Sequence, residues 1–240
     1  MTRRSRAKPP SPFRYFNSSP EVIRLVVMVY VRFPLSLRNV EDLLAERGID
    51  ICRKTVRMWW NRFGPMVAGD IRHQRVSRMR GFRHWRWHLD EMYVKLNGEM
   101  IYLWRAVDHE GEILESFVTK ARGRAAALTF MKKALKRHGS PEVIITDGLC
   151  SYGAAMDELG CREKQEVGRW ANNWVENSHL SFRRRERAML RFRRMASLQK
   201  FASVHANVHN HFALERHLVD RQTYKQRRSA ALAEWQLIAS

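Results

Sequence analysis

Residues 84–119 read HWRWHLDEMYVKLNGEMIYLWRAVDHEGEILESFVT and contain three runs with the alternating pattern of β-strands. The dipeptide Asn97-Gly98 separates the first two runs and favours a type I′ hairpin, because both residues tolerate positive φ. Glu110-Gly111 marks a second turn before the third run. The segment therefore predicts three consecutive strands joined by two turns.

The chain beyond these strands alternates between helical and strand patterns. The predicted elements are a helix at 122–137, a short buried strand at 143–146, a helix at 152–159, a weaker strand at 162–167, helices within 172–215 and a final helix at 223–237. Three strands followed by helix, strand, helix, strand and further helices indicate an α/β fold, with a mixed sheet and flanking helices.

Residues 21–64 predict three short helices, over about 21–31, 36–47 and 53–63, and Gly64-Pro65 is expected to end the third. Two short helices joined by a four-residue turn, the second with a basic outer face, favour a DNA-binding helix-turn-helix. A plain three-helix bundle with a solvated basic face is the alternative. The candidate DNA-contacting residues on the outer face are Arg53, Lys54, Arg57 and Asn61.

The positive charge of the chain is segregated. The formal net charge is +20. Residues 1–87 hold 19 basic and 6 acidic residues, residues 88–180 hold 12 and 14, and residues 181–240 hold 13 and 4. Basic flanks around an acidic middle predict phosphate binding by the flanks and hard metal ions in the middle, rather than a uniformly solvated basic surface.

Other classes of protein are excluded by composition. The chain is 45% hydrophobic, which supports a real core and rules out wholesale disorder. No apolar run approaches the roughly 20 residues of a membrane span, so no membrane partner is expected. The 3 cysteines lack CxxC spacing, which argues against a disulfide scaffold and favours the cytoplasm.

Five regions follow from these patterns. They are a basic flexible arm at 1–20, a helix-turn-helix domain at 21–70, a basic linker at 71–84, an α/β domain at 85–197 and a C-terminal helical region at 198–240.

Three carboxylates occupy informative positions: Asp90 lies in the first strand, Asp147 closes the strand at 143–146, and Glu176 lies in a following helix. The ends of neighbouring strands and one helix bring such groups to one rim. The carboxylates would repel one another unless divalent cations neutralised them, and two Mg²⁺ ions could then clamp an in-line phosphoryl transfer. Glu91, Asp108 and Glu110 also lie nearby; no role is predicted for Glu91, and Asp108 is expected to be a turn residue.

Basic and imidazole groups surround these acids. Arg183 follows Glu176 by seven residues, so two helical turns return it to the same face, where it could hold a DNA phosphate. His88 lies two residues before Asp90 on the same strand face. It could orient the Asp90 carboxylate without binding a metal ion itself.

The ordered motifs resemble those of DDE insertion-sequence transposases of the insertion-sequence-six family, over about residues 13–215. The motifs are LSLRNVEDLLAERGI before a basic helix, WHLDEMYVKLNG around Asp90, YLWRAVDHEG after it, ITDGLCSYGAA around Asp147 and NNWVENSHLSFRRRER around Glu176. The resemblance implies an N-terminal helix-turn-helix and an RNase H-like catalytic domain.

The resemblance also implies site residues and partners. The family's acidic triad corresponds to Asp90, Asp147 and Glu176, its following basic residue to Arg183, and a further family position to His179. It implies two Mg²⁺ ions, with Mn²⁺ able to substitute, cleavage at terminal inverted repeats and transfer of the 3′-OH into target DNA. It further implies a homodimer or larger assembly on the bacterial nucleoid. Arg184 is a further candidate DNA contact. Asp147 and Glu176 are separated by 28 residues, fewer than is common in the family.

Two rival functions remain at this stage. A catalytically decayed copy could act only as a DNA-binding protein, although it would not need to keep three acids. An RNase H-like nuclease without strand transfer would not need a helix-turn-helix.

Overall fold

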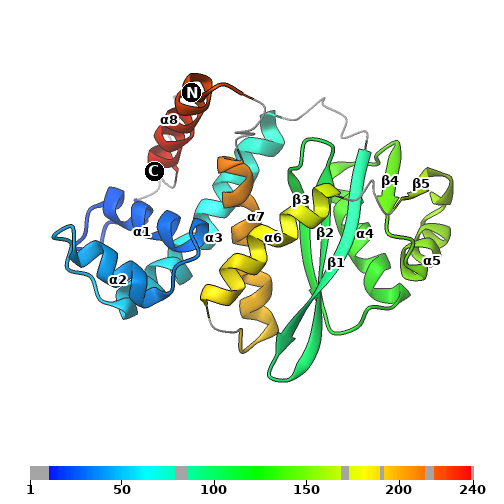
Figure 1. The fold of residues 1–240 in the computed structure, drawn as a ribbon, viewed down its shortest axis with the longest axis horizontal. Helices are drawn as coiled ribbons and strands as arrows, with labels where there is room; N and C mark the ends of the chain where they lie inside the picture. The colour runs from blue at the N-terminus through cyan, green and yellow to red at the C-terminus, as the bar shows by residue number, and fades with distance from the viewer. Residues whose placement is uncertain (1–10, 79–85, 169–172, 190–191, 214–218, 239–240) are drawn as a thin grey trace, which may run out of the picture.

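A five-stranded mixed sheet forms the centre of the chain (Figure 1). The computed structural model describes residues 11–78, 86–168, 173–189, 192–213 and 219–238. The strands are β1 (Arg86–Leu96), β2 (Glu99–Asp108), β3 (Ile113–Thr119), β4 (Val143–Thr146) and β5 (Gln165–Val167), in the order β3-β2-β1-β4-β5. Strands β1 to β3 are antiparallel, whereas β4 pairs in parallel with β1 and with β5. This is the predicted α/β fold with a mixed sheet.

The predicted hairpin is present between β1 and β2. Asn97 has φ 51° and Gly98 has φ 93°, the two positive values that a type I′ turn requires. Asp108 is the predicted turn residue, because its Oδ1 accepts the backbone N–H groups of Glu110 and Glu112 at 3.0 and 2.9 Å. The strand predicted at 162–167 is shorter in the structure. Only its second half forms β5, because Arg162–Lys164 form a 3₁₀ turn.

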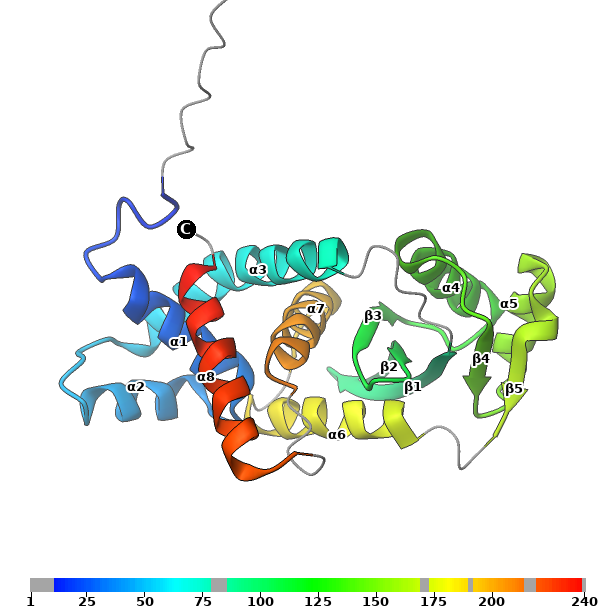
Figure 2. The same cartoon turned by 90° about the horizontal axis from the view of Figure 1, so that it is seen from above.

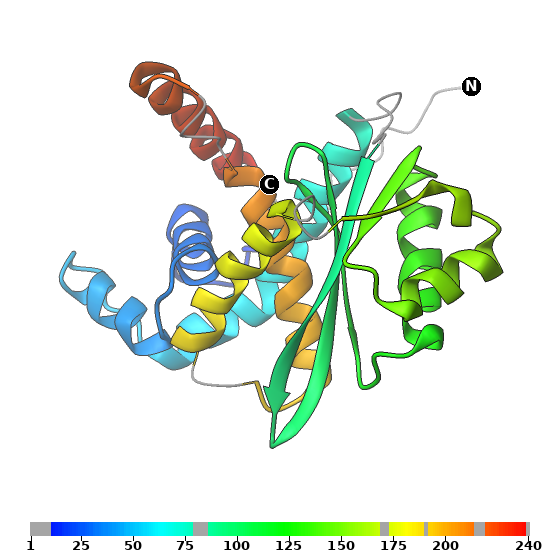
Figure 3. The same cartoon turned by 45° about the vertical axis from the view of Figure 1, so that its right-hand side comes forward.

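Helices cover both faces of the sheet. Figure 3 shows α4 (Arg124–His138) and α5 (Cys150–Leu159) on one side, and α6 (Asn173–Ala188) and α7 (Met195–Phe212) on the other. The α4/α5 face buries an apolar cluster that includes Trp87, Trp104 and Phe130. The opposite face buries Val94 and Leu103 in a core that continues through α6 and α7 into the N-terminal helices.

The N-terminal helices are α1 (Pro20–Arg32), α2 (Leu37–Ala45) and α3 (Arg53–Arg78). Ser36 caps α2 through a reciprocal pair of hydrogen bonds with Asn39, which fixes the start of this helix. Val56 and Trp60 of α3 are buried, whereas the predicted basic face of the same helix points outward. The predicted order of two short helices followed by a basic helix is therefore present.

The predicted end of the third helix at Phe63 is wrong, because α3 continues through Pro65 to Arg78. A proline inside a helix leaves the carbonyl four residues earlier without its N–H donor, and here that carbonyl belongs to Asn61. Lys200 of α7 supplies a substitute: its Nζ lies 3.4 Å from the Asn61 carbonyl oxygen and 2.7 Å from Asn61 Oδ1. The ring of Trp60 occupies the space where a side chain at Gly64 would stand.

Consequently the predicted linker at 71–84 is wrong over 71–78, which is the last part of α3; 79–85 lie outside the described residues. Figure 2 shows α3 running alongside α7 toward the sheet. Arg75 fixes this end of α3, because its Nη2 pairs with Glu112 and lies 3.9 Å from Asp108.

Two further predicted boundaries differ. The arm predicted at 1–20 is packed where the structure describes it, since Phe13 is buried and stacks on Phe63 with 4.8 Å between ring centroids. The two phenylalanines anchor this segment to the core, although its Arg, Pro and Ser content predicts a flexible arm. A boundary at 197–198 would cut α7. The C-terminal helix α8 (Arg221–Leu237) returns to α1, where the Trp235 indole donates to the Arg24 carbonyl at 3.1 Å.

Candidate active site

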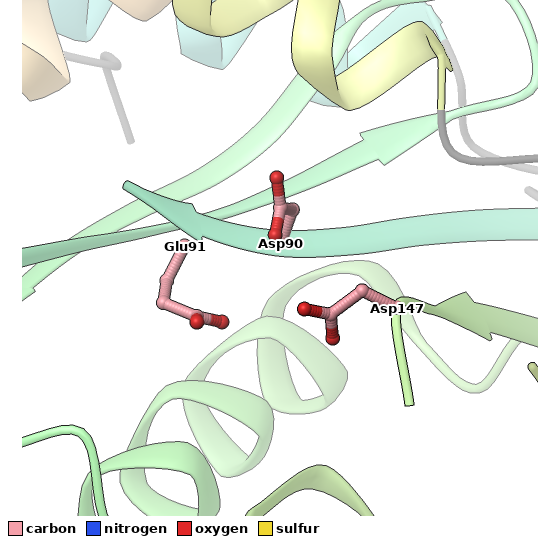
Figure 4. A group of neighbouring side chains, drawn as sticks. All are labelled: Asp90, Glu91 and Asp147. Carbon is pink, nitrogen blue, oxygen red and sulfur yellow. The ribbon is translucent and has the colours of Figure 1, made fainter. Parts of the chain in front are cut away.

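Asp90 and Asp147 meet where β4 separates from β1. The parallel pairing of these strands ends at His88 and Ile145. Asp90 lies two residues after His88, and Asp147 lies two residues after Ile145. Carboxylate oxygens of Asp90, Asp147 and Glu91 all lie within 4.8 Å of one another. Figure 4 shows Asp90 and Glu91 leaving opposite faces of β1, with Asp147 directed toward both. The topology thus brings together the two predicted aspartates and a third acid that was not predicted to join them.

Glu176 reaches the same region from α6. It lies in the first turn of that helix and is exposed to solvent. Its carboxylate is outside the 4.8 Å cluster, yet its negative charge contributes to raising the pKa of Asp90. Glu176 therefore lies close enough to interact electrostatically with Asp90, but outside the cluster that Glu91 joins.

The electrostatics of the cluster centre on Asp90. Burial raises the pKa of Asp90 to about 7, and the charges of Glu91, Asp147 and Glu176 act in the same direction. A buried acid among like charges is costly to ionise. A divalent cation would relieve this repulsion, and carboxylate oxygens are the ligands that Mg²⁺ prefers.

His179 contacts Asp90 from α6. Its Nδ1 lies 3.4 Å from Asp90 Oδ2. Burial lowers the pKa of His179 well below its ordinary value, and the charges of Arg105 and Arg183 lower it further. The neutral imidazole therefore touches Asp90 without adding a charge. His88, the other predicted supporting histidine, is buried on the same face of β1 as Asp90.

Glu91 is held on the opposite face of β1 by two donors. Arg122 Nε donates to its Oε1 at 2.6 Å, and the hydroxyl of Tyr152 donates to its Oε2 at 3.0 Å. The Glu91 side chain is 1% exposed. Burial raises the pKa of Glu91, while the hydrogen bond and charge of Arg122 oppose that rise. Both oxygens of this acid are thus engaged by the protein.

Arg183 lies away from the acidic cluster, toward the β1–β2 hairpin. Its guanidinium donates to the carbonyl oxygen of Tyr93 and, at 2.7 Å, to Glu186 Oε2, and it lies 5.0 Å from the centre of the Tyr93 ring. Arg184 beside it is exposed. Arg183 borders an open cleft of about 770 Å³ lined by Tyr93, Lys95, Asn97, Gly98, Arg183, Glu186 and Arg187.

The predicted DNA-contacting residues of α3 all lie on its exposed face. Arg53, Lys54 and Arg57 border a cleft beside Arg38 of α2, and Arg57 and Asn61 border another beside Arg193 and Lys200. The start of α3 and the start of α7 therefore form one basic surface. Asn61 is already engaged there by Lys200.

Comparison with known proteins identifies the family. A family model described as a DDE domain matches residues 84–215. The chain belongs to the DDE insertion-sequence transposases. Over 172 residues it is 31% identical to the transposase for insertion sequence-like element IS431mec of Staphylococcus aureus, covering 70% of this chain and 75% of that relative. It is 30% identical, with the same coverage, to the transposase for insertion sequence element IS257 in transposon Tn4003 of that species.

Structural neighbours of this transposase are more distant. The catalytic core domain of BIV integrase aligns with 12% identity and a TM-score of 0.37, covering 63% of this chain and 99% of that one. The fold assignment therefore rests on the strand order described above. Within the described residues of the transposase, no helix is long and apolar enough to span a membrane.

Three residues of the transposase site were not predicted from the sequence. Glu91 directly follows Asp90, yet the sequence predicts no role for it. Arg122 lies at the start of the stretch 122–137 that the sequence predicts as a helix, where nothing distinguishes it from the other basic residues. Arg105 interrupts the apolar run Leu103 to Val107 of β2, and a charged residue inside such a run was the available signal.

Proposed function

We propose that this transposase binds the terminal inverted repeats of an insertion sequence, cleaves DNA at the element ends and transfers the freed 3′-OH into target DNA. The observation that supports this most strongly is the meeting of Asp90 and Asp147 at the point where β1 and β4 separate, with Glu176 facing them from α6. Both steps are phosphoryl transfers, so one site serves both.

Asp90, Asp147 and Glu176 are the residues that would hold divalent cations, which we propose to be two Mg²⁺ ions that Mn²⁺ can replace. The clustered oxygens of Asp90 and Asp147 support this assignment. So does the pKa of Asp90, which burial raises to about 7 with further contributions from the charges of Glu91, Asp147 and Glu176. When bound, such ions supply Lewis-acid stabilisation of the charge that develops on the phosphate. Glu91 is less suited to be a ligand, because Arg122 and Tyr152 already occupy its oxygens.

Neighbouring groups orient the proposed ligands. Asp147 Oδ1 accepts the backbone N–H of Leu149 at 3.0 Å, which limits rotation of this exposed carboxylate. His179, kept neutral by burial, contacts Asp90 and leaves its negative charge available for a cation. We propose that His88, buried beside Asp90, restricts the same side chain. Such support around ligands is a common requirement of metal sites.

DNA recognition is assigned to the basic surface outside the acidic site. We propose that Arg53, Lys54, Arg57 and Asn61 face the terminal repeat, and that Arg183 and Arg184 contact phosphates along the path to the acids. Base edges give specificity, whereas phosphate contacts set affinity and position. Two ends must be held together, so we infer a homodimer or larger assembly, acting on the nucleoid in the bacterial cytoplasm.

The test is a cleavage and strand-transfer assay on DNA carrying the element's own ends. We expect nicking at the ends and joined products with Mg²⁺, neither of them with EDTA, and none from Asp147→Asn, which should still bind the ends. Binding without cleavage by the wild-type chain would favour the decayed, DNA-binding copy. Cleavage without joining would favour a nuclease.

A further inference from the structure

Arg122 lies beside the acidic site but belongs to neither β3 nor α4, the elements on either side of it. Its Nε donates at 2.6 Å to Oε1 of Glu91, a side chain that is 1% exposed, while the Arg122 side chain itself is 46% exposed. One edge of the guanidinium is therefore fixed to a buried carboxylate, and the rest of the side chain reaches solvent.

The main chain at Arg122 is fixed as well. The Ser151 hydroxyl donates to the Arg122 carbonyl oxygen at 2.8 Å, and the hydroxyl of the neighbouring, fully buried Tyr152 donates to Glu91 Oε2. Ser151 and Tyr152 lie in the first turn of α5, which begins soon after Asp147. The Arg122 loop is thus tied to the segment that positions one of the clustered acids.

The positive charge of Arg122 lies beside the acidic cluster. Glu91 has an oxygen within 4.8 Å of oxygens of Asp90 and Asp147, so a guanidinium bonded to Glu91 stands next to the cluster. Arg183, the cation predicted for this place, is engaged instead by Tyr93 and Glu186. A DNA phosphate that approaches clustered carboxylates is repelled, and an adjacent arginine offsets that repulsion with paired N–H donors.

We propose that Arg122 binds a non-bridging oxygen of a DNA phosphate at the cleavage site through the guanidinium edge turned away from Glu91. Glu91 is then a positioning residue, because it holds one edge of the Arg122 guanidinium and so sets its direction. The inference rests on the proposed DNA cleavage and adds to it the group that receives the phosphate.

The chain offers a matched control in Arg124. It lies two residues further along, its side chain is 61% exposed, and it also pairs with a glutamate, Glu158. Arg122→Ala and Arg124→Ala therefore remove the same charge from the same surface, and only the first removes it from beside the acids. We expect Arg122→Ala to lower the cleavage rate at saturating DNA at least tenfold, with less than a threefold change in Kd, and Arg124→Ala to change neither appreciably.

The decisive readout uses DNA with a methylphosphonate, which lacks one charged non-bridging oxygen, at each phosphate flanking the cut in turn. At the contacted position the wild-type enzyme slows, and Arg122→Ala produces no further loss. Glu91→Ala should show the same position-specific behaviour, and Glu91→Ala combined with Arg122→Ala should be no slower than Arg122→Ala alone. Circular dichroism and Kd for end DNA establish that each variant is folded.

The experiment distinguishes a failure of this inference from a failure of the proposed function. If the wild-type chain cuts normal DNA while Arg122→Ala and Arg124→Ala behave alike, the role of Arg122 is wrong and the transposase function stands. Additive losses with a methylphosphonate at every position would also overturn it. If the wild-type chain cuts neither normal DNA nor methylphosphonate DNA, both the proposed function and this inference are wrong.

Discussion

Asp90 of β1 and Arg105 of β2 stand directly opposite each other in the antiparallel register. Arg105 is fully buried, and its Nη1 donates to the carbonyl oxygen and hydroxyl of Ser178 in α6 at 2.5 and 3.2 Å. Ser178 lies between Glu176 and His179, the two α6 residues that face Asp90. Arg105 therefore holds the helix that completes the site, from the strand position beside the first aspartate.

This relationship predicts a loss of function without a matching loss of stability in Arg105→Met. Burial lowers the pKa of Arg105 to about 9, which reflects the cost of its charge, so an apolar replacement offsets the lost hydrogen bonds. We expect Tm to change by a few degrees at most, Mn²⁺ affinity measured by electron paramagnetic resonance to fall about tenfold, and cleavage to fall at least as much.

Arg185→Met is the matched control. Arg185 is also a buried arginine, but it donates from α6 to the Leu35 carbonyl at 2.9 Å, away from the acids. We expect it to keep the wild-type Mn²⁺ affinity. Equal Mn²⁺ affinities in the two variants would show that Arg105 has no special relation to the site.

The metal-free stability of the transposase should depend on pH through Asp90. The pKa of Asp90 is raised to about 7, so its favourable contribution is complete below its unfolded value near 4 and is lost as the pH rises through 7. Asp90→Asn removes that loss. In EDTA we expect the variant to be more stable than wild type by ~2–4 kcal/mol at pH 8 and nearly equal at pH 4, measured by urea unfolding.

The same experiment with Mn²⁺ tests the ligand role. The ion should raise the urea midpoint of wild type at pH 8, and should raise that of Asp90→Asn much less. An identical stability difference at pH 4 and pH 8 would mean that Asp90 titrates as an ordinary surface acid.

Arg57→Ala should weaken binding to the terminal repeat by about 1–3 kcal/mol if Arg57 contacts a base edge. Arg57 is exposed near the start of α3, and Arg72 is exposed near the end of the same helix. Arg72→Ala is therefore the control for general charge, measured by fluorescence anisotropy at fixed salt. Unchanged affinity in Arg57→Ala would mean that another face of the helix reads DNA.

Arg183→Glu should suppress strand transfer far more than it lowers DNA affinity, because the Arg183 guanidinium donates to the carbonyl oxygen of Tyr93 on the strand that carries Asp90. Arg187→Glu, one turn further along α6, makes the same change of charge. Transfer yield and Kd are measured together for both. Equal effects would make Arg183 one member of a nonspecific basic surface.

The fold was predictable where local pattern decides it. The period of two and Asn97-Gly98 define β1 and β2, and a short apolar run defines β4. The continuation of α3 was not predictable, because the residue that compensates for Pro65 is Lys200, distant in sequence.

The residues of the site likewise divide into those that the sequence predicts and those that depend on distant contacts. The meeting of Asp90 and Asp147 was predictable from their places in two strands and from the family resemblance. The link from Glu91 to Arg122 spans 31 positions and depends on the face of β1 that covers Glu91. Arg105 required knowledge of which helix packs over β2.

We propose that Glu176, and not Glu91, completes the catalytic acids with Asp90 and Asp147. The most direct measurement compares single-turnover cleavage of end DNA by Glu176→Gln and Glu91→Gln, with Glu163→Gln and Glu166→Gln as exposed controls. If Glu176 is a ligand, its variant loses about a thousandfold or more in rate while binding DNA normally. Glu91→Gln keeps an oxygen for Arg122 and should lose about tenfold or less. A nearly active Glu176→Gln enzyme beside an inactive Glu91→Gln enzyme would instead make Glu91 the third acid.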